Sequence, residues 1–333
     1  MKEFAEVAAR GMTLIYGPPG CGKTSVAMRL ASRLEGRVMW VSTAEGPDLL
    51  VQVARRLGVD SSKFNFLDFP RAFQKDILRY ILDHVGKYGV VVIDSVEGVA
   101  GRQNIDVATH SVLYQVAKEK PVILIAEEET PRLAYVADHV VHVWCRINKL
   151  GHMMRYIQLE KSRVRPPSPR YIFEIVEGVG IAYTYPLVTR GHTELLEDED
   201  LGITAPAHSV LCVHSESIKN LANYLSKIKE EAIYIKLGHW TPFHGVVKDE
   251  RNMYVIKTTN DIFRLIHDVA SGKIRPSYVI VGGLLNVPEE DRADYVTLFY
   301  ALSSYVKFLL FASVGPKTET EKLEKYCDDV IRA

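Results

Sequence analysis

The 333-residue sequence lacks several features that would place it in a specialised class of protein. No apolar run reaches the roughly 18 residues that a membrane-spanning helix needs, and the first residues lack the basic-then-apolar pattern of a signal peptide. Lys+Arg and Asp+Glu both number 41, so the formal net charge is zero and no global attraction to nucleic acid is expected. We therefore expect a cytoplasmic protein without a membrane segment.

Cysteine is also scarce. The four cysteines are Cys21, Cys145, Cys212 and Cys327. They include no C-x-x-C pair, which excludes the usual spacing of a metal knuckle or a dithiol redox motif. Because free cysteine is among the most often buried residues, this pattern favours four buried thiols.

The composition is that of a folded protein. Hydrophobic residues make up 47% of the chain and charged residues 25%, which is typical of soluble globular domains. A chain of this length fits two domains of about 150 residues each.

A phosphate-binding loop is the most specific motif. The apolar run Met12–Tyr16 is followed by Gly-Pro-Pro-Gly-Cys-Gly-Lys-Thr and then by a helical pattern, so the motif stands between a strand and a helix. In this context backbone N–H groups and the helix N-terminus bind phosphates, Lys23 reaches the β- and γ-phosphates, and the Thr24 hydroxyl ligates magnesium. The predicted nucleotide-binding residues are Gly17, Pro18, Pro19, Gly20, Cys21, Gly22, Lys23, Thr24 and Ser25.

Two carboxylates follow the next apolar strands. Glu45 comes after the predicted strand 37–42, and Asp94 ends the continuous apolar run 90–93. The carboxyl ends of parallel strands form the ligand-binding edge of an open α/β sheet. Asp94 is the predicted magnesium-shell carboxylate, whereas Glu45 taken alone is equally compatible with a solvated turn residue. The residue after Asp94 is Ser95, not the glutamate that AAA+ and transporter-type ATPases place there.

This order of motifs resembles the RecA superfamily, and within it the archaeal KaiC-like and RadA/RadB-like ATPases. The likeness covers about residues 11–185. It implies ATP and Mg²⁺ as ligands and Glu45 as the group that activates the attacking water. It also implies that Lys161 and Arg163 reach the γ-phosphate bound by a neighbouring subunit, although an ordinary exposed strand would show the same alternation. The acidic run Glu127–Glu129 departs from the RadA pattern and favours the KaiC side.

The second half looks like a degenerate copy of the first. Apolar runs near residues 210, 232, 278, 308 and 329 repeat the order of the first half, which indicates an internal repeat. The copy has His214-Ser215-Glu216-Ser217 in place of a phosphate loop and Gly282 in place of Asp94. An unrelated α/β domain is the alternative. His239 and His244 lie in a segment without carboxylate or Cys at ligand spacing, so we interpret it as a loop.

We therefore predict an α/β protein. It has a RecA-like P-loop NTPase fold with a mostly parallel sheet, followed by a second, degenerate RecA-like α/β domain. The expected boundaries are 1–187 for the ATPase domain, 188–206 for a linker and 207–333 for the second domain. The expected function is ATP binding and hydrolysis coupled to assembly or partner binding. The alternatives are a RadB-like accessory factor in DNA recombination and a nucleotide sensor that does not hydrolyse ATP. We expect a homo-oligomer formed through the ATP site and a protein partner for the second domain, and we do not favour nucleic acid.

Overall fold

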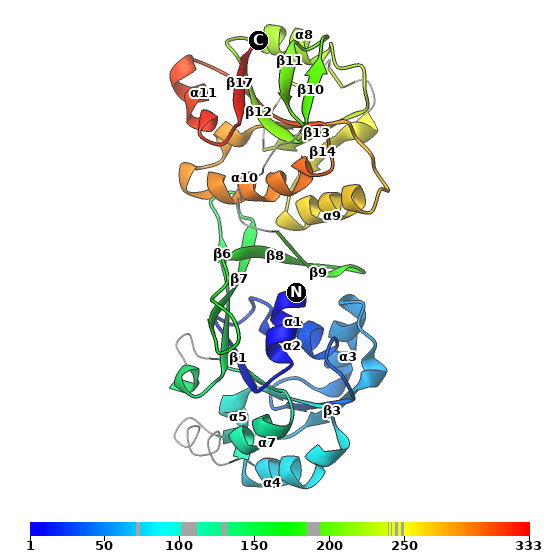
Figure 1. Cartoon of the computed structure of the whole chain (residues 1–333), viewed down its shortest axis with the longest axis vertical. Helices are drawn as coiled ribbons and strands as arrows, with labels where there is room; N and C mark the ends of the chain where they lie inside the picture. Colours follow the sequence, from blue (N-terminus) through cyan, green and yellow to red (C-terminus); the bar gives the residue numbers. More distant parts are fainter. Residues whose placement is uncertain are drawn as a thin grey trace. The chain divides into compact units, whose positions relative to one another are not determined.

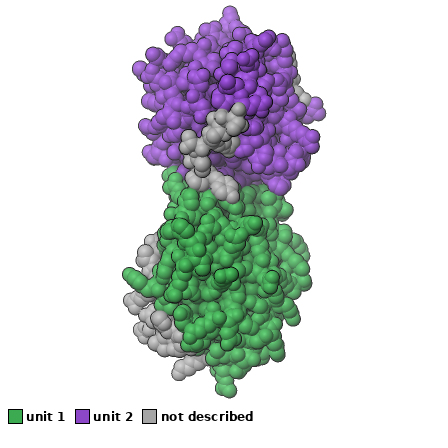
Figure 2. Space-filling model, in the orientation of Figure 1, with its two compact units in different colours: residues 1–146, 154–183 green, residues 147–153, 184–333 purple. Residues whose placement is uncertain are grey.

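The chain forms two compact units, which Figure 2 shows in different colours. The computed structural model describes residues 1–70, 74–100, 112–127, 132–184, 194–238 and 250–333, together with residues 240, 242–243 and 246–247. Unit 1 comprises residues 1–146 and 154–183, and unit 2 comprises residues 147–153 and 184–333. The predicted boundary at residue 187, the acids Glu128 and Glu129, and the histidines His239 and His244 lie outside the described residues.

Unit 1 is organised around a nine-stranded sheet in the order β3-β2-β4-β5-β1-β6-β7-β8-β9. Strands β1 to β6 pair in parallel, and β7 pairs with β8 in antiparallel fashion. The strands are β1 (Met12–Tyr16), β2 (Val38–Ser42), β3 (Phe64–Asp68), β4 (Val90–Asp94), β5 (Val122–Ile125), β6 (His139–Ile147), β7 (Met153–Ser162), β8 (Tyr171–Val176) and β9 (Gly180–Thr184). The predicted strands near residues 12, 38, 90 and 122 are confirmed.

Both faces of this sheet are covered by helices (Figure 1). Alternate residues of β4 belong to opposite cores: Val90 and Val92 pack with α1, α2 and α3, while Val91 and Ile93 pack with α4, α5 and α7. This explains why the strands read as continuous apolar runs. The helices are α1 (Lys2–Ala8), α2 (Lys23–Ala31), α3 (Pro47–Arg56), α4 (Gln74–His84), α5 (Val96–Ala100) and α7 (Tyr114–Glu119), with short 3-10 turns η1 (Ser61–Lys63), η3 (Val85–Lys87) and η5 (Arg132–Tyr135).

Unit 2 contains a second, all-parallel sheet in the order β14-β13-β15-β16-β12-β17. Helix α8 packs on one face with the core that includes Leu211 and Ile280, and α10 contacts β12 and β16. The strands are β12 (Ser209–Ser215), β13 (Ala232–Leu237), β14 (Met253–Ile256), β15 (Tyr278–Gly282), β16 (Phe308–Val314) and β17 (Asp329–Arg332). The helices are α8 (Ile218–Leu225), α9 (Thr259–Ala270), α10 (Glu289–Ser303) and α11 (Lys317–Glu324), with 3-10 turns η6 (Glu250–Asn252) and η7 (Leu284–Asn286).

The two sheets share one topology. When strands are numbered from the first strand of each large sheet, β14-β13-β15-β16-β12-β17 repeats the order β3-β2-β4-β5-β1-β6. One side-chain hydrogen bond is also repeated. The Asp138 carboxylate accepts a hydrogen bond from the Met12 N–H at 2.9 Å, and the Asp328 carboxylate accepts one from the Val210 N–H at 2.8 Å. In both units the first strand is therefore joined to the segment before the sixth strand in the same way.

The segment expected to be a linker contains regular structure. Strands β10 (Leu195–Asp198) and β11 (Ile203–Pro206) form an antiparallel pair. Leu201, Ile203 and Ala205 are buried in the unit 2 core. The linker interpretation is corrected for residues 195–206, because β11 pairs with β10 and alternates buried and exposed residues.

The prediction of four free thiols is wrong. Cys21 is bonded to Cys145 within unit 1, and Cys212 is bonded to Cys327 within unit 2. The partners are 124 and 115 positions apart in the sequence. They meet only because β6 lies beside β1 and β17 lies beside β12. Spacing along the chain contains no sign of such long-range pairs, since a disulfide depends on distances in the folded chain.

Candidate functional site

The P-loop connects the end of β1 to the start of α2. Gly17, Gly20 and Gly22 all have positive φ angles, at 137°, 79° and 103°, a region that glycine adopts far more readily than other residues. A Cβ on Gly17 would lie 1.8 Å from the Val143 carbonyl oxygen, while no atom lies within 4 Å of a Cβ position on Gly20. The loop therefore packs tightly against β6 at its start and is open at its centre.

Lys23 is the first residue of α2, and its ammonium group turns back onto the loop. Lys23 Nζ donates hydrogen bonds to the carbonyl oxygens of Gly17 at 2.6 Å and Pro18 at 3.0 Å. Burial lowers the pKa of Lys23, while the charges of Asp94, Glu127 and Glu97 act in the opposite direction. The ammonium thus lies between the phosphate loop and a group of carboxylates.

Thr24 and Asp94 form the predicted magnesium pair. The Thr24 hydroxyl donates a hydrogen bond to Asp94 Oδ2 at 3.0 Å. Asp94 ends β4 and is 7% exposed. Burial raises the pKa of Asp94 to about 7, the Thr24 hydrogen bond and Lys23 lower it, and Glu45 and Glu127 raise it further. The sheet register brings these groups together, because β4 pairs with both β2 and β5.

Glu45 follows β2 in a turn that one side chain holds in place. Ser42 Oγ accepts a hydrogen bond from the Glu45 N–H at 3.0 Å and donates one to the Glu45 carbonyl oxygen at 2.7 Å. Glu45 Oε2 is buried and has no hydrogen-bond partner among the described residues, and burial raises the pKa of the carboxyl group. Since Glu45 acts electrostatically on Asp94, the turn directs this carboxyl group toward the Lys23–Asp94 site.

A hydrogen-bonded chain of side chains beside Asp94 was not foreseen. The Ser95 hydroxyl donates to Glu127 Oε1 at 2.8 Å, and the Glu127 N–H donates to Glu97 Oε1 at 2.8 Å. In the sequence, Glu127 stands out only as part of the acidic run Glu127–Glu129. The available signal was its position one residue after the strand segment 122–126, at the same sheet edge as Asp94.

Lys161 and Arg163 have contacts away from the P-loop. Lys161 Nζ donates to the carbonyl oxygens of Ala134 at 2.9 Å and Tyr135 at 3.2 Å. Arg163 Nε lies 2.9 Å from Asp138 Oδ1, and the arginine side chain is 60% exposed. Within the described residues, both cations therefore contact the segment before β6, while the guanidinium stays open to solvent.

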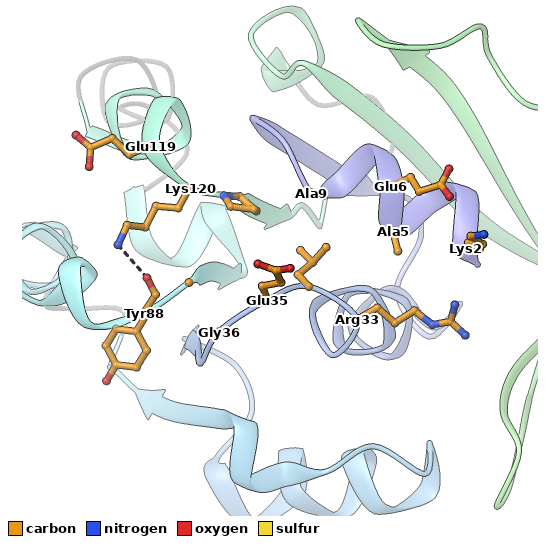
Figure 3. A pocket seen from close by; sticks show the side chains of 13 residues that line it. Lys2, Ala5, Glu6, Ala9, Arg33, Glu35, Gly36, Tyr88, Glu119 and Lys120 are labelled. Carbon is orange, nitrogen blue, oxygen red and sulfur yellow. Dashed lines mark hydrogen bonds between the residues drawn. The ribbon is translucent and has the colours of Figure 1, made fainter.

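A large cavity lies at the other edge of the unit 1 sheet and is not this site. Figure 3 shows its lining, and its volume is about 1000 Å³. Its walls come from α1 and from the segments that precede β2, β4 and β5, where Lys120 Nζ donates to the Tyr88 carbonyl oxygen at 2.9 Å. These are the amino ends of the parallel strands, whereas the P-loop, Glu45 and Asp94 lie at the carboxyl ends.

Two other kinds of feature, a membrane-spanning helix and a metal-binding cluster, are absent from the described residues. No helix there is long and apolar enough to cross a membrane. No cluster of three or more His, Cys, Asp or Glu side chains in the same residues has the arrangement of a metal centre.

Unit 1 is thus a P-loop NTPase domain of RecA-like fold. A family model described as an AAA domain matches residues 7–132, the segment that contains the P-loop and Asp94.

Similarity to known proteins identifies the family. The chain is 30% identical over 198 residues to the DNA repair and recombination protein RadB of Pyrococcus horikoshii, a match that covers 51% of this chain and 85% of the relative. It is 29% identical over 195 residues to RadB of Pyrococcus abyssi, covering 51% and 84%. It is 26% identical over 193 residues to RadB of Thermococcus sibiricus, covering 50% and 84%. The chain belongs to the RadB family of RecA-like P-loop ATPases, through a match that spans about half of its length.

Proposed function

We propose that this protein is a magnesium-dependent ATPase whose nucleotide state controls its assembly or its contact with a protein partner. The observation that supports this best is the convergence of Lys23, Thr24, Asp94 and Glu45 at one edge of the unit 1 sheet. These groups come from three separate segments of the chain, and a merely structural glycine turn would require none of them.

The residues present fit Mg²⁺ and ATP. The open centre of the loop at Gly20 leaves room for a phosphate, and among the described residues the Lys23 ammonium is bonded to two loop carbonyls that a phosphate can replace. The Thr24 hydroxyl and the Asp94 carboxylate are hard oxygen ligands of the kind that Mg²⁺ prefers. The bound ion would neutralise charge on the phosphoryl group that is transferred.

Glu45 is the best general base in the site. A base must have a free oxygen to accept the proton of the attacking water, and a raised pKa brings a carboxylate closer to the useful range. Glu45 Oε2 has no hydrogen-bond partner within the residues that the structure describes, and burial raises the pKa of the Glu45 carboxyl group. The fixed turn at Ser42 holds the residue in position, which lowers the entropic cost of orienting it.

Assembly would complete the site. Phosphoryl transfer is commonly accelerated by a cation that another subunit supplies. Arg163 is the candidate, because its guanidinium is exposed and paired with one carboxylate only among the described contacts. We propose that a homo-oligomer brings Arg163 and Lys161 of one chain to the nucleotide of the next, and that unit 2 binds a protein partner.

The test measures ATP turnover and molecular mass together. We expect turnover that requires magnesium, and a mass by light scattering that changes when ATP and magnesium are added. Tight ATP binding with no turnover at saturating ATP would instead identify a nucleotide sensor. Turnover with an unchanged mass at all protein concentrations would contradict the assembly part of the proposal.

The family favours a second candidate, an accessory role in DNA recombination or repair. The named relatives are DNA repair and recombination proteins, and seven basic residues lie between positions 146 and 170 with one acid, Glu160. However, four of the seven already pair with acids from other segments. These pairs are Lys149–Glu290, Arg155–Glu174, Arg163–Asp138 and Arg165–Glu3. Filter binding to DNA across a salt series tests this second candidate, because contacts to DNA phosphates make the affinity depend steeply on salt concentration.

A further inference from the structure

The P-loop is tied covalently to the neighbouring strand. Cys21 is the fifth residue of the loop, and its sulfur is bonded to Cys145 of β6 with the Cα atoms 5.3 Å apart. Cys21 is 1% exposed and belongs to the core cluster that packs against α2, and Cys145 packs against the same cluster. The bond thus lies on the interior side of the loop and leaves the backbone of the loop for phosphate binding.

Without this bond the loop would have considerable conformational freedom. Three of its glycines have positive φ, and Gly20 has no neighbour within 4 Å of a Cβ position. The last residue of β1, Tyr16, pairs with His142, so β6 continues beyond β1 and runs beside the loop. The disulfide therefore fixes the centre of the loop to a strand that the sheet already holds rigid.

We propose that the Cys21–Cys145 disulfide is a thiol–disulfide exchange site that sets the affinity of the P-loop for ATP. Backbone N–H groups of the loop bind the phosphates, so ordering the loop in advance lowers the entropic cost of binding. Fixing one residue has an entropic cost of about 1–2 kcal/mol, so we expect reduction to weaken ATP binding by about tenfold. The inference rests on the nucleotide site proposed above.

The reaction partner is a dithiol. Its thiolate attacks Cys145 Sγ, the sulfur of the half-buried cysteine, and Cys21 departs as a thiolate. The second thiol of the partner then resolves the mixed disulfide, which leaves two protein thiols and an oxidised partner after transfer of two electrons and two protons. Cys21 precedes Gly22, the N-cap of α2, and the positive end of that helix stabilises a departing thiolate.

The second disulfide supplies a matched control. Cys212 is 0% exposed in the middle of β12 and is bonded to Cys327, two residues before β17, so this bond lies within unit 2, whose sequence has no phosphate loop. Loss of the Cys212–Cys327 bond should lower the stability of unit 2 without changing the P-loop.

The experiment uses the full chain and measures ATP affinity by calorimetry before and after treatment with dithiothreitol, with thiols counted in denaturant each time. We expect no free thiols before reduction, four afterwards, and a dissociation constant for ATP that is about tenfold higher in the reduced protein. Cys145→Ser should show the weaker affinity in both conditions. Cys327→Ser should keep the full response to reduction.

Several outcomes would overturn the proposal. Four thiols before reduction would show that the bond does not form. Equal affinity before and after complete reduction would leave the nucleotide site intact and remove only the redox inference. Equal loss of the response in Cys145→Ser and Cys327→Ser would indicate a general effect on stability. Failure of the oxidised protein to bind ATP at all would instead overturn the nucleotide site itself, and with it this inference. Thermal melts by circular dichroism confirm that each variant is folded. The comparison of oxidised with reduced wild-type protein tests the proposal even if a variant does not fold.

Discussion

Lys23 is the residue on which ATP binding should depend most. In the part of the chain that the structure describes, its ammonium is bonded to two loop carbonyls, so Lys23→Ala removes the charge that faces the phosphates without opening the core. Charge-assisted hydrogen bonds contribute about 1.5–3 kcal/mol each, and losing two or more should weaken ATP binding at least 100-fold. Calorimetry measures the affinity, and a thermal melt checks the fold. Lys118→Ala, an exposed lysine on α7, serves as the control, and nucleotide affinity retained in Lys23→Ala would show that the site is assigned wrongly.

Substitution of Glu45 tests whether this residue is the general base of ATP hydrolysis. Glu45→Gln keeps the size of the side chain and the Ser42 contacts, which involve only the backbone of residue 45. The amide cannot take the proton of the attacking water, so we expect ATP affinity within about twofold of wild type and turnover lower by about 10²- to 10⁴-fold. A steady-state phosphate-release assay measures the loss. If turnover is unchanged, Glu45 is a turn residue without a catalytic role.

At the scale of helices and strands, the sequence predicted those parts that local patterns define. Continuous apolar runs identified the parallel strands β1, β2, β4 and β5, because burial on both faces removes the alternation of a half-exposed strand. The P-loop motif fixed the turn between β1 and α2. Contacts between segments that are distant in the sequence could not be predicted from local patterns. The disulfides and the Ser95–Glu127–Glu97 chain form only when strand ends meet at one edge of a sheet.

Substitutions in the hairpin β10–β11 test whether residues 195–206 belong to the folded core of unit 2 and are not a linker. Ile203 is 4% exposed in the unit 2 core, whereas Thr204 on the opposite face of the same strand is exposed. Ile203→Ala should lower the free energy of unfolding of unit 2 by about 2–4 kcal/mol because it leaves a cavity. Thr204→Ala should change it by less than about 0.5 kcal/mol. Urea unfolding measures both, and equal small effects would show that the segment behaves as a linker in solution.

For the whole molecule, the repeated topology raises the question of how many nucleotides one chain binds. In unit 2 the end of β15 has Gly282 where unit 1 has Asp94 at the end of β4. A Cβ on Gly282 would lie 2.1 Å from Nε1 of Trp240, so the indole fills the space that a carboxylate would need. Unit 2 also lacks a glycine loop after β12. Ser215, the last residue of β12, is followed by Glu216 and then by Ser217, the N-cap of α8.

We therefore predict one ATP per chain. Titration of the full chain by calorimetry should give a stoichiometry near one, and Lys23→Ala should bind no nucleotide with comparable affinity. A residual site in Lys23→Ala with the stoichiometry of one per chain would place nucleotide binding in unit 2. It would also contradict the interpretation of unit 2 as a copy that has lost its chemistry.

The last prediction concerns catalysis across a subunit boundary. Residues two apart on a strand point to the same side, and both Lys161 and Arg163 contact the segment 134–138. If Arg163 acts on the ATP of a neighbouring chain, Arg163→Ala should lower turnover by about 10³- to 10⁵-fold, and wild-type activity per chain should rise with protein concentration. Arg165→Ala, which removes the same charge two residues further along, should have little effect.

Mixing two inactive variants separates action in trans from action in cis. In a mixed oligomer of Glu45→Gln and Arg163→Ala, some sites combine an intact Glu45 with an intact Arg163 from the adjacent chain. Those sites should hydrolyse ATP, so activity should partly return, as measured by phosphate release. Native mass spectrometry establishes that mixed oligomers are present. If they are present and the mixture remains as inactive as its components, Arg163 acts within its own chain or has no catalytic role. The ion pair with Asp138 would then be its function, because this contact, together with those of Lys161, holds the segment before β6 against the end of β7.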